Sequence, residues 1–485
     1  MAKKLKQEKY LNQEVKNQNS VKIKAPIVEA LKTAYENPTY QFHIPGHTKG
    51  KAIFKDFRKL IGEKALNIDT TDEFDNLGTL HPATGPIKEA QELAAEAFGA
   101  KKTFFLLNGS TAGNLALAMA LTKKGDKVIV NRNCHRSVLT GMIISGAEPI
   151  WICPNRIEDW SIWGNTDAAQ IEELINKNPD VSMVWITNPT YEGVVSDIKA
   201  ISAVCKKHNI PLIVDEAHGC LWNFNKHLPE TALKLGADAV VHSLHKTGGS
   251  MSQSSMLHIA KDSCLNVEAV EKALKLLHTT SPSLMLLASL DAARANLQSK
   301  NGQILLERAV KNAKYLRTRL DSIQGLHQLK GDFGYKTDVT KVFIRIDGLS
   351  GKRLESILEI DFGIEVESAS DIGVLILCNI GNKHSDFKYL ADCLEKIAAT
   401  NYQDIYYLEK RKHMPMLEPQ IKMSLREAFY AEKETIPKSE AIGRISAEVV
   451  AECPPGISIL LPGELITEEH LPYLNDYETL EVVRV

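Results

Sequence analysis

Lys246 is the residue of this sequence that most directly suggests covalent chemistry. It lies in the segment HSLHKTGG (residues 242–249), which follows the apolar, strand-like run ADAVV. Ser243 and His245 supply hydrogen-bond donors beside the lysine, and the two following glycines let the backbone approach a ligand closely. Such a set suits a lysine that forms a Schiff base with pyridoxal phosphate (PLP) while its neighbours bind the phosphate. A lysine in a polar surface loop is the commoner explanation of one such motif, so other residues must decide.

An acidic residue stands at the end of another apolar run. Asp215 follows PLIV (residues 211–214) and begins the sequence DEAHG. A carboxylate in this position can pair with the pyridine nitrogen of PLP and keep it protonated, so that the ring accepts electrons. The small Ala217 would leave room for the ring. The alternative is that Asp215 caps a following helix.

Two more polar clusters occur at comparable positions. Ser110 and Thr111 precede the apolar helical segment LALAMALT, and the N-terminus of a helix favours an anion such as phosphate. Ordinary helix caps use the same residue types. His135 follows the run KVIV and could stack on a cofactor ring, although most lone loop histidines are only solvated. Because each of the four clusters follows a strand or opens a helix, together they predict a single cleft.

The elements that must position these residues alternate between strands and helices. Continuously apolar strands separated by helices predict a parallel sheet covered on both faces, over about residues 80–290. Ligands of such a sheet bind at the carboxyl ends of its strands. The predicted strands are residues 127–130, 149–153, 181–187, 211–214 and 239–241, and helices are predicted at Asp167–Asn176 and Ile198–His208.

The rest of the chain has a different pattern. A helical stretch from Leu284 to Gln324 precedes a smaller α+β pattern, with strands at 341–347, 364–367 and 374–378 and helices at 353–358 and 386–398. We therefore expect four parts, which are an N-terminal segment (1–75), a PLP-binding large domain (76–300), a small α+β domain (301–400) and a C-terminal domain (401–485).

Composition excludes several classes of protein. The 485 residues include 58 Lys and Arg against 60 Asp and Glu, a net charge of -2, which does not favour nucleic acid. The eight cysteines form no CxxC pair and no Cys/His zinc spacing, so we expect no metal. The N-terminus has no apolar signal region, and the longest uncharged stretch, 103–122, contains polar residues that lipid does not tolerate. We expect a cytoplasmic protein that binds neither nucleic acid nor a membrane.

The sequence resembles the bacterial ornithine/lysine/arginine decarboxylases, which are PLP enzymes of the aspartate-aminotransferase fold (fold type I). The matching motifs follow the family order from about residue 40 to 465. They are FHIPGHTKG (42–50), LHPATGPIKEAQELAAEAFGA (80–100), NGST (108–111), RNCHRSV (132–138), NPTYEGVVSD (188–197), DEAHG (215–219), HSLHKTGGSMSQSS (242–255), SPSLMLLASLD (281–291), GRISAE (443–448) and CPPGISILLPGE (453–464).

The resemblance implies an α/β fold of type I and a role for each cluster. Lys246 would form the Schiff base, Asp215 would pair with the pyridinium nitrogen and His135 would stack on the ring. His218 would contact the substrate carboxylate or the cofactor–substrate adduct. The residues implied to hold the phosphate are Ser110, Thr111, Ser243 and His245.

The resemblance also implies decarboxylation of a basic L-amino acid. L-Arginine, which gives agmatine, is expected first, with lysine and ornithine as alternatives. The basic end of the substrate needs an acidic partner, for which Glu464 in LPGE is the candidate and Glu367 a rival. An aminotransferase or a C–S lyase of the same fold would use the same Lys, Asp and His. Other classes left open are a PLP-binding regulatory protein without catalysis and a scaffold without cofactor.

In this fold the site usually lies between two subunits, so Ser281 and Ser283 are expected to reach a neighbour's phosphate. Large family members begin with a wing domain, whereas about 40 polar residues precede FHIPGH here. The chain therefore resembles the short branch, and a homodimer or homotetramer with shared sites is expected. Cys453 stands where a tyrosine often precedes PPG.

Overall fold

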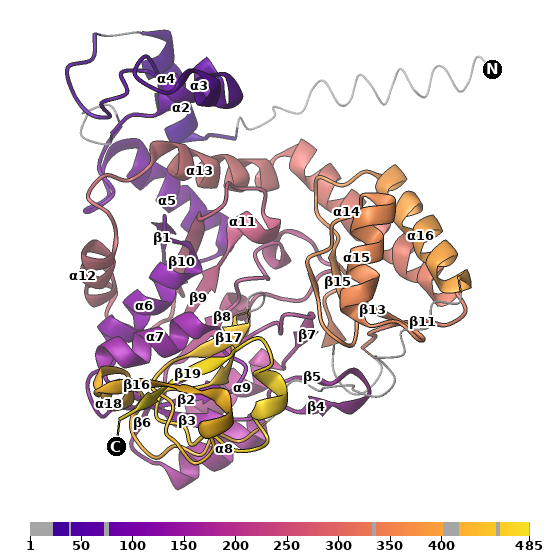
Figure 1. The fold of residues 1–485 in the computed structure, drawn as a ribbon. Coiled ribbons are helices and arrows are strands. Elements are labelled where there is room, and N and C mark those ends of the chain that lie inside the picture. The colour runs from indigo at the N-terminus through magenta and orange to yellow at the C-terminus, as the bar shows by residue number, and fades with distance from the viewer. Residues whose placement is uncertain are drawn as a thin grey trace.

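The structure is a computed structural model that describes residues 23–37, 40–71, 77–331, 336–400, 417–452 and 456–484. The polar N-terminus up to residue 22 and Cys453 lie outside these residues. A large central sheet lies between N-terminal helices at one end of the molecule and the C-terminal part at the other, with a smaller α+β unit beside it (Figure 1). None of the described helices is both long and apolar enough to cross a membrane.

The central sheet has seven strands, and the sequence predicted five of them. The two missed strands, β1 and β10, lie next to each other at one end, and β10 runs antiparallel to both of its neighbours. The sheet is therefore mixed at that end rather than wholly parallel as predicted. The strand order is β1 (Lys102–Leu106), β10 (Ser255–Ile259), β9 (Ala239–His242), β8 (Leu212–Asp215), β6 (Val181–Thr187), β2 (Lys127–Asn131) and β3 (Glu148–Ile152).

The antiparallel direction of β10 follows from the short connection before it. Only one short helix, α11 (Leu244–Thr247), lies between β9 and β10. A parallel neighbour usually needs a longer crossover through a helix that packs on the sheet. Because the chain turns back directly after α11, Lys246 in this helix lies at the carboxyl end of β9.

Helices cover both faces of the central sheet, as continuously apolar strands require. One face packs against α6 (Gly109–Leu121), α7 (Arg136–Ser145) and α12 (Val267–Leu277). The other face packs against α8 (Ala168–Lys177), α9 (Ile198–Lys207) and α10 (Ala232–Leu235), and at the β1 end against α5 (Gly85–Phe98) and α13 (Leu284–Gln298).

The predicted helical stretch from Leu284 to Gln324 is two helices, α13 and α14 (Lys300–Asp321). Ser299 interrupts it with extended backbone, and its hydroxyl accepts a hydrogen bond from the Gly302 amide at 3.0 Å, which caps α14. A Cβ atom on Gly302 would lie 1.7 Å from the carbonyl oxygen of Asn296. Only glycine allows the two helices to approach this closely.

The small α+β unit (residues 300–331 and 336–400) contains an antiparallel sheet in the order β11, β13, β15, β14. The strand predicted at 364–367 was wrong, because these residues only connect α15 to β14 and pairing with β15 begins at Ser368. The elements are β11 (Leu326–Gln328), β13 (Lys341–Ile346), α15 (Gly351–Phe362), β14 (Ser368–Ala369), β15 (Val374–Leu377) and α16 (His384–Ala399). One further pair, β7 (Val194–Val195) with β12 (Lys336–Thr337), joins this unit to the loop after β6.

The two ends of the chain add smaller units. In the C-terminal part, β16 (Lys433–Pro437) pairs with β19 (Thr479–Val483), β17 (Val450–Glu452) pairs with β18 (Ile457–Leu460), and α18 (Leu425–Tyr430) packs on α7. At the opposite end lie α2 (Pro26–Glu36), α3 (Lys55–Ile61) and α4 (Glu63–Ile68) (Figure 1).

Candidate active site

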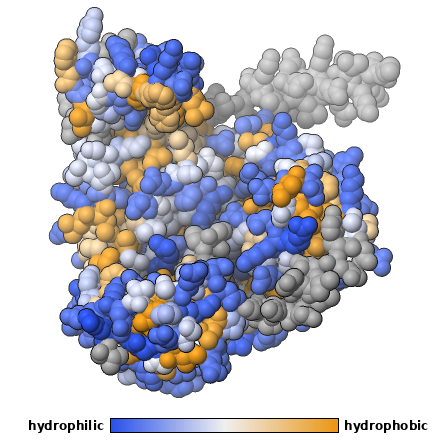
Figure 2. Space-filling view, viewed as in Figure 1, coloured by the Kyte–Doolittle hydropathy of each residue, from blue (hydrophilic) through white to orange (hydrophobic). Residues whose placement is uncertain are grey.

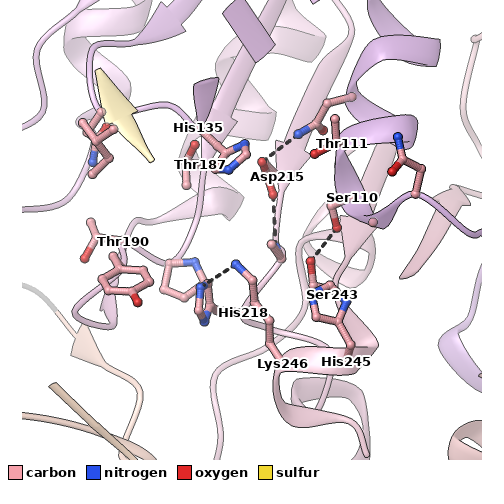
Figure 3. A pocket seen from close by; sticks show the side chains of 18 of the residues that line it. Ser110, Thr111, His135, Thr187, Thr190, Asp215, His218, Ser243, His245 and Lys246 are labelled. Atoms are coloured by element: carbon pink, nitrogen blue, oxygen red, sulfur yellow. Dashed lines mark hydrogen bonds between the residues drawn. The ribbon is translucent and has the colours of Figure 1, made fainter. Parts of the chain in front are cut away.

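A cavity of about 240 Å³ lies where the carboxyl ends of β2, β6, β8 and β9 meet. The four polar clusters predicted from the sequence all line it, and Figure 3 shows their side chains pointing into one space. Glu464, the first candidate for the contact with the basic end of the substrate, does not line it. Those that do are Ser110, Thr111, His135, Asp215, His218, Ser243, His245 and Lys246.

Lys246 and His218 form a hydrogen-bonded pair in this cavity, with 2.9 Å between Nζ and Nε2 (Figure 3). His218 is buried, and burial together with the nearby Lys341 and Lys246 ammonium groups lowers its pKa well below the usual range. The imidazole is therefore neutral at neutral pH, and Nε2 can accept a hydrogen bond from a protonated Lys246. The pair can hold a proton next to any group bound by Lys246.

Asp215 is a buried carboxylate, 3% exposed, at the end of β8. One oxygen accepts a hydrogen bond from Asn114 Nδ2 at 3.0 Å and the other from the Ala217 amide at 3.2 Å. No cationic side chain of the described residues lies within ion-pair distance of it. Since a buried carboxylate without a cation is costly, the geometry suits a cationic group of a ligand bound in the cavity.

Asn114 was not predicted from the sequence. It lies one turn after Ser110 in α6, on the same helix face, and also donates to Ser137 at 2.9 Å. That four-residue spacing was the available signal. Thr187 was missed too, although it ends β6 as Asp215 ends β8, and its buried hydroxyl has no partner among the described residues.

His135 is held in the cavity by its own helix, α7, and by the C-terminal part of the chain. It caps α7, and its Nδ1 lies 2.7 Å from the Ser137 hydroxyl. Gly456, from the C-terminal part, packs on the ring, where a Cβ atom would lie 3.1 Å from Cδ2 and Nε2. The Gly456 carbonyl accepts a hydrogen bond from the Arg136 amide at 3.0 Å. Burial lowers the pKa of His135, so the ring that faces the cavity is neutral at neutral pH.

One end of the cavity collects hydroxyl and amide donors. Ser110 and Thr111 stand at the N-terminus of α6, and Ser110 Oγ lies 2.7 Å from Ser243 Oγ. His245 is anchored through Nδ1 to the Ser254 carbonyl at 2.8 Å. Hydroxyls at a helix N-terminus are suited to a phosphate.

The arrangement fits PLP. One cavity contains hydroxyl donors suited to the phosphate, the amine of Lys246, and the carboxylate of Asp215, which has no cation beside it. The hydroxyl of Thr187, which has no partner among the described residues, is available to a polar substituent of the ring. Among the described residues, no group of three or more His, Cys, Asp or Glu side chains is placed to hold a metal ion.

Glu464 lies in the interior of the C-terminal part, away from the cavity. Its carboxylate accepts a hydrogen bond from the Leu461 amide at 3.0 Å and lies 3.3 Å from His470 Nε2 and 3.9 Å from an Arg132 nitrogen. Gly463, with a φ of 83°, makes the turn that directs the chain here. This geometry does not support the predicted contact between Glu464 and a substrate.

The rival acid, Glu367, contacts a residue of the cavity wall. Its carboxylate accepts a hydrogen bond at 2.7 Å from the hydroxyl of Tyr191, which lines the cavity. Ser281 and Ser283 do not line the cavity of their own chain, and Ser283 caps α13.

Comparison with known proteins gives consistent matches over nearly the whole chain. Residues 25–342 match the family described as Orn/Lys/Arg decarboxylase, major domain, and residues 407–482 match its C-terminal domain. An arginine decarboxylase of Bacillus subtilis (strain 168) is 39% identical over 93% of this chain and 92% of its own length. Another, of Halalkalibacterium halodurans, is 37% identical over 91% of each chain. The solved lysine decarboxylase A from Pseudomonas aeruginosa shares the fold, with a TM-score of 0.84 over 95% of this chain and 80% of that chain at 22% identity.

The buried position of Glu464 leads to a stability prediction. Glu464→Gln keeps the side-chain shape but removes the charge that faces Arg132, so we expect the free energy of unfolding to fall by about 2 kcal/mol. Urea denaturation measures it. The control is Glu468→Gln at an exposed position nearby, which should change the value by less than about 0.5 kcal/mol. Equal stability of both variants would contradict a structural role for Glu464.

Proposed function

The chain belongs to the Orn/Lys/Arg decarboxylase family, and from this premise we propose that it converts L-arginine to agmatine and carbon dioxide. Its fold is fold type I and its cofactor is PLP, as expected from the sequence. The observation that carries the proposal is the buried Asp215 without a cation, in one cavity with Lys246. Arginine is placed before lysine because two arginine decarboxylases are 39% and 37% identical to the chain, whereas a lysine decarboxylase of Pseudomonas aeruginosa is 26% identical.

PLP, when bound, supplies a protonated ring that accepts the electron pair of the breaking bond between Cα and the carboxylate. The side chains of this protein would bind the cofactor and orient it in the cavity. Asp215 would hold the proton on the ring nitrogen. His135 forms the part of the cavity wall that would face the ring. The donors at the α6 N-terminus, with Ser243 and His245, fix the phosphate end.

The proton that replaces carbon dioxide on Cα can come from either member of the Lys246–His218 pair. The two nitrogens lie within hydrogen-bond distance, so a proton can pass between them. Because the pKa of His218 is lowered, the shared proton rests on Lys246, and Nε2 of the neutral imidazole accepts the hydrogen bond that orients the amine.

Product analysis tests the proposed reaction. PLP-loaded protein is given L-arginine, L-lysine and L-ornithine separately, and carbon dioxide and the amine formed are measured. We expect agmatine and carbon dioxide in equal amounts, with slower release from the other two. Lys246→Ala should abolish both turnover and the visible absorbance of the bound cofactor.

Other products would overturn parts of the proposal. Cadaverine or putrescine as the main amine would overturn the choice of arginine. A keto acid without carbon dioxide would identify an aminotransferase, which uses the same lysine and aspartate. A protein that remained colourless with PLP and released no carbon dioxide would exclude the enzyme altogether.

We also propose that the protein is a homodimer or a dimer of dimers whose contact includes the N-terminal helices. Large apolar side chains are exposed there, among them Phe42 (98% exposed) and Leu60 (82% exposed). Figure 2 shows hydrophobic residues on the surface of this part of the molecule. Exposed apolar side chains gathered in one place are typical of an interaction surface, and a second copy of the chain is the occupant that the proposed function favours.

Light scattering on the purified protein tests the assembly. We expect two or four times the chain mass of 53.8 kDa. Combined Phe42→Asp and Leu60→Asp substitutions should shift the protein to the monomer, because each places a charge in an apolar contact. The matched control is Ile360→Asp on α15, where the replaced side chain is 77% exposed but lies in the small α+β unit. A monomeric wild type would contradict the proposed assembly.

A further inference from the structure

A lysine of the small α+β unit is connected to the active site through one tyrosine. Lys341 begins β13 and is only 2% exposed. Its Nζ donates a hydrogen bond to the backbone carbonyl of Tyr191 at 2.6 Å and lies 5.2 Å from the centre of the tyrosine ring. The ring in turn meets His218 edge-on, with 5.3 Å between ring centres and an angle of 88°. Lys341, Tyr191, His218 and Lys246 thus form one continuous series of contacts.

The other end of Tyr191 is also held by the small α+β unit. Its hydroxyl donates to Glu367 at 2.7 Å. No described residue of the small α+β unit lines the cavity itself. Tyr191, which does line it, therefore connects this unit to the catalytic pair of Lys246 and His218.

The loop that carries Tyr191 leaves space for the side chain of Lys341 at Gly193. Gly193 has a φ of 99°, and a Cβ atom there would lie 2.9 Å from Cβ and Cδ of Lys341. Pairing of β7 with β12 and the hydrogen bond from the Asp338 amide to the Gly193 carbonyl, at 2.9 Å, hold the loop against the small α+β unit. The aliphatic part of Lys341 can reach Tyr191 only because residue 193 is glycine.

Lys341 is buried without an ion-pair partner. No carboxylate of the described residues lies within 4.0 Å of its Nζ, a placement that is unfavourable for an ammonium group. Burial lowers its pKa to about 8, so at neutral pH it is still mostly protonated. The charged groups that face it are Asp338, Glu192, Glu367 and Lys246.

We propose that Lys341 is a positioning residue for the active site. It holds Tyr191 against His218, and its positive charge keeps His218 neutral, so that Nε2 can accept the hydrogen bond from Lys246. The other groups that face His218 are Lys246, His245 and His135, which also disfavour a second proton on the ring. This inference rests on the proposed function only where kcat/KM is measured.

The pH profile of kcat/KM distinguishes this role from a structural one. Lys341→Met removes the charge, so His218 gains a proton more easily and the low-pH limb should move to higher pH by about one unit. Lys341→Arg keeps the charge and should leave the limb in place. The ratio of kcat/KM of Lys341→Met to that of the wild type should therefore rise with pH and level off once His218 is neutral in both proteins. A low-pH limb that stays in place in Lys341→Met would overturn the proposal.

Thermal unfolding of the cofactor-free protein gives a second readout. Folded Lys341, with a pKa of about 8, loses its proton before the unfolded lysine does at 10.5. The unfolded state then binds more protons, so stability rises with pH between these values. The Tm of the wild type minus that of Lys341→Met should therefore increase from pH 8 to pH 10. A constant difference would show that Lys341 is not a buried cation and would overturn the proposal.

A second variant keeps the proposal testable should Lys341→Met not fold. Glu367→Gln, at a half-buried position, removes one of the acids that raise the pKa of Lys341, so the pH-dependent rise in Tm should begin at lower pH. An unchanged onset would count against the proposal. If the wild type releases no carbon dioxide from any basic amino acid, the proposed function fails, whereas the Tm measurements still test the environment of Lys341.

Discussion

The site depends on a carboxylate that is buried at the end of a strand with no cation of the described residues beside it. Asn114 and Ala217 fix the two oxygens of Asp215 but do not neutralise the charge. In the proposed function, a protonated ring nitrogen bound in the cavity would offset the cost of this burial. The helix that supplies Asn114, α6, also presents Ser110 at its N-terminus, one turn earlier. One helix therefore sets the spacing between Ser110, proposed to hold the phosphate, and the carboxylate of Asp215.

Parts of the chain that are distant in sequence complete the cavity around this helix. The C-terminal part contributes Gly456, which packs on His135, and anchors the same loop through hydrogen bonds from Arg132 to the carbonyls of Ser458 and Ile459, at 2.7 and 3.0 Å. Glu464, buried beside Arg132, belongs to this support. The small α+β unit acts on the opposite side through Tyr191. The cavity around α6 is thus supported by the C-terminal part on the side of His135 and by the small α+β unit on the side of Tyr191.

The sequence predicted the residues that follow apolar strands, because the carboxyl ends of parallel strands meet at one edge. Lys246 and Asp215 were found in this way, and both line the cavity. The direction of the LPGE turn depends on Gly463 and on the distant Arg132, so the sequence alone could not place Glu464. Lys341 was missed for a similar reason. It reads as the polar first residue of a strand, and its burial results from a contact with a loop 150 positions earlier in the chain.

The most direct test of the account is the protonation state of the bound ring. The ¹⁵N NMR chemical shift of PLP labelled at the pyridine nitrogen can be measured in the holoprotein at neutral pH. We expect the shift of a protonated nitrogen in the wild type and of an unprotonated nitrogen in Asp215→Ala, because the buried carboxylate is the group proposed to hold that proton. An unprotonated ring nitrogen in the wild-type protein would contradict the pairing of Asp215 with a protonated ring.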